Sequence, residues 1–169
     1  MNEQDIMNAV KAVMSQMDGV KTSSKGQQKI DNISLDLANL LIEKVKAKAA
    51  EMGVNAVVAV STNQGRPISV QCMDDAFIAS YDIALKKTFT SVSLKMSTDD
   101  LSRLSQPGQP LYGIQFTNDG NIVIFGGGEP LMNNGKLVGA VGVSGGTAPQ
   151  DTALAAYGKK VFEEVLTCL

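Results

Sequence analysis

One glycine-rich segment limits the folds open to this chain more than any other feature. It covers residues 125–151, with the sequence FGGGEPLMNNGKLVGAVGVSGGTAPQD, and holds half of the sixteen glycines. Its middle predicts a short strand at Glu129–Met132, a turn with positive φ at Asn133-Asn134-Gly135, and an apolar strand at Lys136–Val143. The segment therefore predicts a β-hairpin.

Glycine loops precede and follow this hairpin, at Gly126-Gly127-Gly128 and at Ser144-Gly145-Gly146. Because glycine has no side chain, such loops let the backbone approach another backbone or a ligand closely. Asp151 is predicted to stand at the start of an amphipathic helix, whose N-terminus attracts negative groups. Two interpretations stay open: the glycines line a ligand pocket, or they only shape turns and bulges.

Composition excludes several classes of protein. A chain of 169 residues with 44% hydrophobic content is long enough for one domain with one core and a tail. The net charge of -2 argues against nucleic acid and against an anionic membrane surface as partners. No apolar run reaches the roughly 18 residues that span a bilayer, and the N-terminus lacks the order of a signal peptide. Two cysteines, Cys72 and Cys168, form no disulfide framework, which favours the reducing cytoplasm.

The chain contains no histidine. This excludes a Ser-His-Asp triad, a Cys-His nucleophile and His-based zinc or iron sites. Two cysteines alone cannot complete a Cys₄ zinc site. Any catalysis would rest on Lys, Tyr, Cys or carboxylate side chains.

Residues 1–17 are predicted to form a separate amphipathic helix, residues 18–29 a flexible polar linker, and residues 30–169 the main domain. A helix this short is marginal in water, so it needs a surface to fold against. Its own domain is one option, and the linker favours the other, a partner. The apolar stripe of this helix consists of Ile6, Val10, Val13, Met14 and Met17.

Four helices are predicted in the main domain. The first covers residues 35–52, with Ser34 as N-cap and Gly53 as the stop, and the last covers residues 149–168. A long helix at residues 76–96, capped by Asp74 or Asp75, is followed by a short helix at residues 97–105 that opens on a capping box. The inner face of the long helix is predicted to be Ile78, Tyr81 or Asp82, Leu85, Phe89, Val92 and Met96.

Three more strands are predicted, at Val54–Val60, Pro67–Met73 and Asn121–Phe125. Leu111–Phe116 fits either a helical turn or a short strand. With the hairpin, five strands in hairpin-like connections and helices around them predict an α+β fold with an antiparallel sheet flanked by helices.

Three segments resemble the GlcG/HbpS/PduO C-terminal-domain family: AVVAVSTNQGRPISVQCMDDA, ALKKTFT and the glycine-rich segment. The resemblance covers about residues 33–169. It implies a profilin-like α-β-α sandwich on a five-stranded antiparallel sheet, assembly into homo-oligomers, and binding of haem or a corrinoid such as cobalamin. The positions that match the family pattern are Met73, Asp74, Ala84, Lys87, Thr90, Gly127, Gly128, Pro130, Gly142, Val143, Ser144, Gly145 and Asp151.

The sequence departs from this family in two places. Lys87 is followed by Thr88 where the family usually has alanine, and a haem ligated by histidine is impossible here. Side chains that are chemically able to ligate haem iron instead are Tyr81, Tyr112, Met73 and Cys72.

The tail is similar to the short N-terminal encapsulation helices that carry cargo into bacterial microcompartments. Both have an acidic residue followed by the apolar spacing seen in residues 1–17. This resemblance implies a location inside a microcompartment of the cytoplasm, with a shell protein as partner.

Three functions follow from these observations. The first is a non-catalytic accessory protein that binds a tetrapyrrole or another small anionic ligand. Its pocket would consist of Gly126, Gly127, Gly128, Glu129, Ser144, Gly145, Gly146 and Asp151, with Lys87 as the counter-charge for a carboxylate or phosphate.

The second is a small enzyme with a Lys87/Asp151 acid–base pair, and the third is a structural assembly module without a ligand. Ser144 lacks the spacing of a nucleophile elbow and has no histidine to activate it, so we interpret it as a turn residue.

Overall fold

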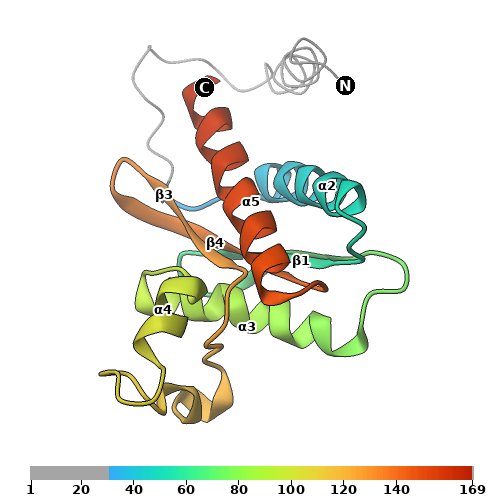
Figure 1. Ribbon diagram of the computed structural model, residues 1–169. Coiled ribbons are helices and arrows are strands. Elements are labelled where there is room, and N and C mark those ends of the chain that lie inside the picture. Colours follow the sequence, from blue (N-terminus) through green and yellow to red (C-terminus); the bar gives the residue numbers. More distant parts are fainter. Residues whose placement is uncertain (1–30, 169) are drawn as a thin grey trace.

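The computed structural model describes residues 31–168 (Figure 1). The predicted helix at residues 1–17 and the predicted linker at residues 18–29 lie outside the described residues. None of the helices within residues 31–168 has both the length and the hydrophobicity to cross a membrane. The described elements are α2 (Leu35–Glu51), β1 (Val57–Thr62), β2 (Pro67–Cys72), α3 (Ile78–Leu94), α4 (Thr98–Leu104), the 3₁₀ turns η1 (Ile114–Phe116) and η2 (Asn118–Gly120), β3 (Gly128–Asn133), β4 (Lys136–Ser144) and α5 (Ala148–Cys168).

The strands form one antiparallel sheet in the order β2-β1-β4-β3. Helices α2 and α5 cover one face and α3 covers the other, so the domain has three layers (Figure 1). The main core lies between the sheet and the α2/α5 pair. It includes Leu41, Ile42, Val45, Val58, Val141, Leu154 and Phe162, all fully buried.

The hairpin prediction is confirmed. Strands β3 and β4 pair with Asn133 opposite Lys136, and Asn134 and Gly135 in the turn have φ of 50° and 76°. Two successive residues with positive φ match the twist of the flanking strands, which is why Asn-Gly stands here.

The predicted ends of several helices are also confirmed. The Ser34 side chain accepts a hydrogen bond from Leu37 N at 3.2 Å, and the Ser97 hydroxyl accepts one from Asp100 N at 3.0 Å. Gly53 ends α2 with φ of 66°. Gly158 in α5 lies so close to α2 that an added Cβ would be 3.0 Å from Val45 Cγ2, which explains a glycine inside a helix.

Helix α3 differs from its prediction in where it begins and which face it buries. It begins at Ile78, and the residue before it, Phe77, gives no side-chain cap, so neither Asp74 nor Asp75 caps it. The predicted inner face is wrong at the start of the helix, since Ile78 is 97% exposed and Tyr81 50% exposed, whereas Val92 is buried as predicted. The buried residues are small or polar instead: Ser80, Ala84, Lys87, Thr88, Thr90, Ser91 and Val92.

The sheet beneath α3 explains this choice of face. At Gly142 of β4 an added Cβ would overlap the carbonyl oxygen of Ala84 and lie 2.8 Å from Thr88 Cγ2. The helix backbone therefore sits almost directly on the strand. Only small side chains fit between them, and the apolar stripe is turned to the side.

The fifth predicted strand, Asn121–Phe125, is also wrong. Val123 N donates to Thr90 Oγ1 at 3.0 Å, and the carbonyl oxygen of Asn121 lies 3.3 Å from the same hydroxyl. A side chain of α3 thus satisfies backbone groups that a neighbouring strand would otherwise bond. The sheet has four strands, so the profilin-like five-stranded sheet is not found. Of the two alternatives for Leu111–Phe116, the helical turn is correct, as η1.

We expect Gly142→Ala to destabilise the fold strongly, by about 3 kcal/mol or more, because overpacking must push α3 off the sheet. Gly53→Ala is the matched control, since an added Cβ there meets nothing within 4 Å and only the positive φ is strained. That control should cost about 1 kcal/mol. Urea unfolding measures both, and equal costs would show that α3 is not held this close to β4.

Candidate functional site

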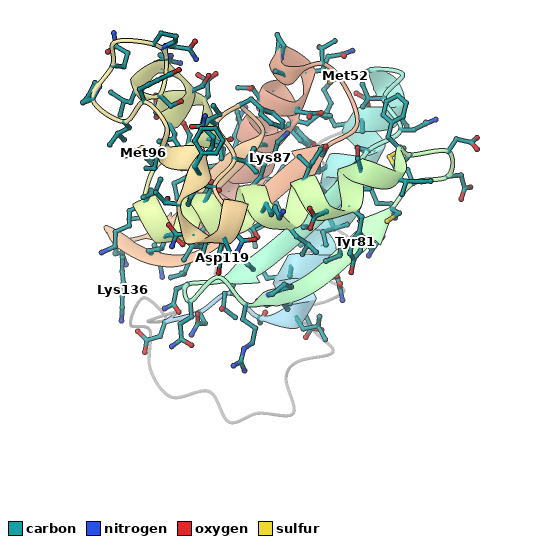
Figure 2. The ribbon with its side chains drawn as sticks, turned by 90° about the horizontal axis from the view of Figure 1, so that it is seen from below. Met52, Tyr81, Lys87, Met96, Asp119 and Lys136 are labelled. Atoms are coloured by element: carbon teal, nitrogen blue, oxygen red, sulfur yellow. The ribbon has the colours of Figure 1, made fainter. Side chains whose placement is uncertain are left out.

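The two glycine loops meet at Lys87. Its side chain extends from α3, is fully buried, and donates from Nζ to the Val143 carbonyl oxygen at 2.7 Å and to Asp151 Oδ2 at 2.8 Å. Asp151 is also buried. In Figure 2 Lys87 lies on the side of α3 away from Tyr81. One ammonium group therefore joins α3, β4 and α5.

Asp151 occupies the first turn of α5, where an anion is favoured. Its second carboxylate oxygen, Oδ1, accepts a hydrogen bond from Gly146 N at 2.9 Å. Beside it, Gln150 Oε1 accepts from both the N–H and the hydroxyl of Thr147, as in a capping box. Asp151 therefore supplies the negative charge that the glycine loop and the N-terminus of α5 attract.

Gly127 covers this ion pair and allows no side chain. Its φ is 114°, and an added Cβ would lie 2.6 Å from Lys87 Nζ and 2.8 Å from Asp151 Cβ. Its carbonyl oxygen accepts from Val143 N at 2.7 Å. The backbone at Gly127 thus makes a close approach, as the sequence predicts, and the group that it approaches is the protein's own ion pair.

Phe125 closes the remaining side of the ammonium group. The centroid of its ring lies 4.9 Å from Lys87 Nζ, within the range of a cation–π contact, and the residue is 40% exposed. An ammonium has three N–H donors, and the two hydrogen bonds above use two of them. The ring thus covers the part of the ammonium with the remaining donor.

Two side chains near the first loop have displaced pKa values. Burial lowers the pKa of the Lys87 ammonium, and the Asp151 carboxylate offsets part of this effect. Burial raises the pKa of Glu129, and Lys159, with Nζ 3.3 Å from Glu129 Oε2, opposes that shift.

The structure brings together four of the predicted site residues: Lys87, Gly127, Gly146 and Asp151. The others have separate surroundings. Gly126 packs against Thr152, Gly128 against Ser91 and Thr98, and Gly145 against Asn55. The Ser144 hydroxyl donates to Ser80 Oγ at 3.2 Å, and Glu129 pairs with Lys159.

Sequence reasoning missed Phe125 and the Val143 carbonyl as partners of Lys87. Phe125 was expected to end a strand. Its position directly before the glycine triplet is the one signal in the sequence that it belongs to this site. The Val143 carbonyl is a backbone group, which no residue pattern identifies.

The candidate haem ligands differ in accessibility. Met73 packs against the main core, and its Sδ accepts from Ala56 N at 3.4 Å. Cys72 is an exposed free thiol at the end of β2, and Tyr81 and Tyr112 are 50% and 65% exposed. Within residues 31–168, no three His, Cys, Asp or Glu side chains are grouped so as to hold a metal ion.

Comparison with known proteins establishes the family. The model of the family described as "Haem degrading protein HbpS-like" matches residues 33–160. This chain therefore belongs to the HbpS-like family, and the resemblance drawn from its motifs is confirmed.

Three similar proteins place the chain more closely. It is 46% identical over 138 residues to an uncharacterized 15.0 kDa protein of the dhaT-dhaS intergenic region of Citrobacter freundii, covering 82% of this chain and 97% of that protein. It is 38% identical over 108 residues to the corrinoid adenosyltransferase PduO of Salmonella typhimurium, covering 64% of this chain but 32% of PduO. The solved structure described as a PduOC:heme complex is 33% identical, with a TM-score of 0.74, and the match covers 76% of this chain and 94% of that one.

We expect Lys87→Met to cost about 3 to 5 kcal/mol, because it leaves the Asp151 carboxylate buried without a counter-ion. Lys87→Met combined with Asp151→Asn should be more stable than the single variant, since the amide keeps an oxygen for Gly146 N and carries no charge. Urea unfolding measures both. Lys159→Met is the control, because it breaks a partly exposed pair and should cost about 1 kcal/mol or less. A double variant no more stable than Lys87→Met would contradict this account.

Proposed function

We propose that this protein is a non-catalytic accessory protein that binds a tetrapyrrole, with haem as the first ligand to test. The observation that carries the proposal is the exposure of aromatic side chains. Five of the eight aromatic residues of the chain are exposed: Phe77, Tyr81, Tyr112, Phe116 and Phe125. Aromatic rings of this size normally bury much of their surface, and the three that share one connection, Tyr112, Phe116 and Phe125, indicate a binding surface.

We place the ligand on the long connection between α4 and β3, residues 105–127. It carries Tyr112, Phe116 and Phe125, and it leads directly into Gly126-Gly127-Gly128. A flat apolar macrocycle stacks well on aromatic faces, and loops without side chains allow a close approach. Membership of the HbpS-like family and similarity to a PduO domain solved with haem support this choice.

Lys87 has a conditional role in this proposal. A haem carries two carboxylates, and one of them can face the ammonium only if the Phe125 ring moves aside and frees the third N–H. Asp151 then keeps its own hydrogen bonds. The ligand thus replaces a cation–π contact with a stronger charge-assisted hydrogen bond.

Tyr112 is our choice of iron ligand, since it lies on the same connection and is well exposed. A tyrosine phenolate is an established type of haem ligand. Cys72 ends β2, Tyr81 lies on the side of α3 away from Lys87, and Met73 Sδ already accepts a hydrogen bond from Ala56 N. Without histidine in the chain, the haem spectrum should differ from that of a His-ligated protein.

The test is a titration of the full chain with hemin and, in parallel, cobalamin, followed by the Soret or corrin absorbance. We expect a saturable shift with hemin, loss of the phenolate-to-iron absorption in Tyr112→Phe, and roughly tenfold weaker binding in Phe125→Ala, equivalent to about 1.4 kcal/mol. Tyr81→Phe is the matched control and should bind as the parent does. No shift with either compound would overturn the proposal and leave the assembly module as the alternative.

We also propose that residues 1–17 direct the protein into a bacterial microcompartment by docking on a shell protein. The apolar stripe Ile6, Val10, Val13, Met14 and Met17 on a polar tether supports this proposal, since such a helix folds when its stripe is covered.

A fluorescent protein fused to residues 1–30 tests the packaging role in cells that produce shells. We expect the fusion to co-purify with shells and Val10→Glu to abolish this, because a charge on the stripe prevents docking. Lys11→Glu changes charge outside the stripe and should have little effect. Equal recovery of all three fusions, or of none, would contradict a docking role for the stripe.

A further inference from the structure

We propose that β2 pairs with β2 of a second copy of this chain, antiparallel about a two-fold axis at Val70, so that the two sheets become one. The inference does not depend on the ligand. It rests on the open edge of the sheet, on the direction of the backbone groups of β2, on its charge pattern, and on the exposed stripe of α3.

Strand β2 is an edge of the sheet, and the features of it that discourage pairing, Pro67 and the bulge beside it, stand at its beginning. It has the sequence PISVQC, without one charged side chain, and its proline stands at the first position. The other edge strand, β3, carries Glu129 and Pro130, which are residues that discourage pairing. The uncharged edge is therefore the one suited to a second strand.

The free backbone groups of β2 belong to alternate residues. Met73 N donates to the Ala56 carbonyl oxygen at 3.0 Å, so Gln71 and Ser69, two and four residues before it, also face β1. Val70 and Cys72 therefore direct their N–H and C=O groups away from the sheet. Two copies of Val70 placed opposite each other would exchange both hydrogen bonds, as the central pair of an antiparallel ladder does.

This register also matches opposite charges. With Val70 opposite Val70, Ile68 lies opposite Cys72. Arg66 and Asp74 lie just beyond the two ends of β2, so they come to the same end of the pair, once at each end. The bulge beside Pro67 takes Arg66 out of the regular register, so this is a match of charged ends and not a ladder pair. Arg66 and Asp74 are both exposed, and neither has an ion-pair partner among residues 31–168. A shift of several residues in either direction would separate both charge pairs.

Exposed apolar residues on the side of α3 would cover the joined sheet of the two copies. Ile78, Tyr81, Leu85 and Phe89 recur at helical spacing, and we call them the α3 flank. An added Cβ at Gly65, in the β1–β2 turn, would lie 3.3 Å from the Phe89 ring, so the flank faces the β2 side of the sheet. Figure 2 shows Tyr81 beside that strand. Ile78, the most exposed large hydrophobic residue of the described chain, belongs to this flank with Tyr81, on the side of the open edge.

A two-fold axis perpendicular to the sheet reverses the strand and keeps each face on its own side. Both α3 helices then lie on the same face, with their flanks turned towards each other. The same operation that completes the hydrogen bonds therefore brings the exposed apolar residues together, as an isologous interface requires.

The first test is sedimentation of the full chain over a range of concentrations. We expect a dimer, or a multiple of it, whose dissociation constant rises at least tenfold in Arg66→Asp and in Asp74→Arg. Arg66→Asp combined with Asp74→Arg should return it to the parent value, because the charges are exchanged and not removed. Lys160→Asp on α5 is the control and should change nothing. A monomeric parent, or no recovery in the double variant, would overturn the proposal.

The second test fixes the register. In a Cys72→Ser background, Val70→Cys should form a covalent dimer under mild oxidation, since residues directly opposite in a ladder have Cα atoms about 5.5 Å apart. The Cys72→Ser parent still contains Cys168 and should stay uncrosslinked. Failure of Val70→Cys to crosslink, in a protein that remains dimeric, would mean that another surface makes the dimer.

Discussion

The ion pair of Lys87 and Asp151 is the interaction on which the rest of the structure depends. Each charge would be costly to bury alone, and each is acceptable here because the other is within 2.8 Å and backbone groups complete the hydrogen bonds. The pair fastens α3 and α5 to the end of β4, on opposite sides of the sheet. The glycines around it follow from this arrangement, because a side chain at Gly127 would occupy the space of the ammonium.

This arrangement also changes the meaning of the family motif. The lysine, the glycine loops and the aspartate look like an anion pocket in the sequence, and the structure shows that Asp151 itself is the anion. In our proposal, binding of a ligand near the loops depends on Phe125, whose ring lies against the Lys87 ammonium, more than on a free positive charge. The exposed aromatic residues fall into two sets, one on the connection before β3 and one along α3, and we assign them to the ligand and to a second copy.

Patterns in the sequence predicted the hairpin, the caps at Ser34 and Ser97, and an antiparallel sheet flanked by helices, since each depends on neighbouring residues or on simple periodicity. The division into three layers was implied by the family resemblance. Such patterns failed where distant contacts decide. The apolar stripe of α3 lies on the side of the helix and does not face the sheet. Gly142 allows the helix to lie so close to the sheet that large side chains do not fit between them. Asn121–Phe125 has the composition of a strand, and Thr90 takes its backbone hydrogen bonds instead. The meeting of Lys87 with Asp151 was suggested by the motif, but no spacing rule predicts that the pair is fully buried.

The fastening by Thr90 has a further consequence for the connection before β3. Its far end is held at Val123, and near its start Leu111 N bonds to the Leu104 carbonyl oxygen at 3.0 Å. A chain held at both ends samples fewer conformations than one held at a single end, so less entropy remains to be lost when something orders it. Folding has therefore already ordered much of the segment that carries the exposed rings of Tyr112 and Phe116. This lowers the entropic cost of any contact that these rings make.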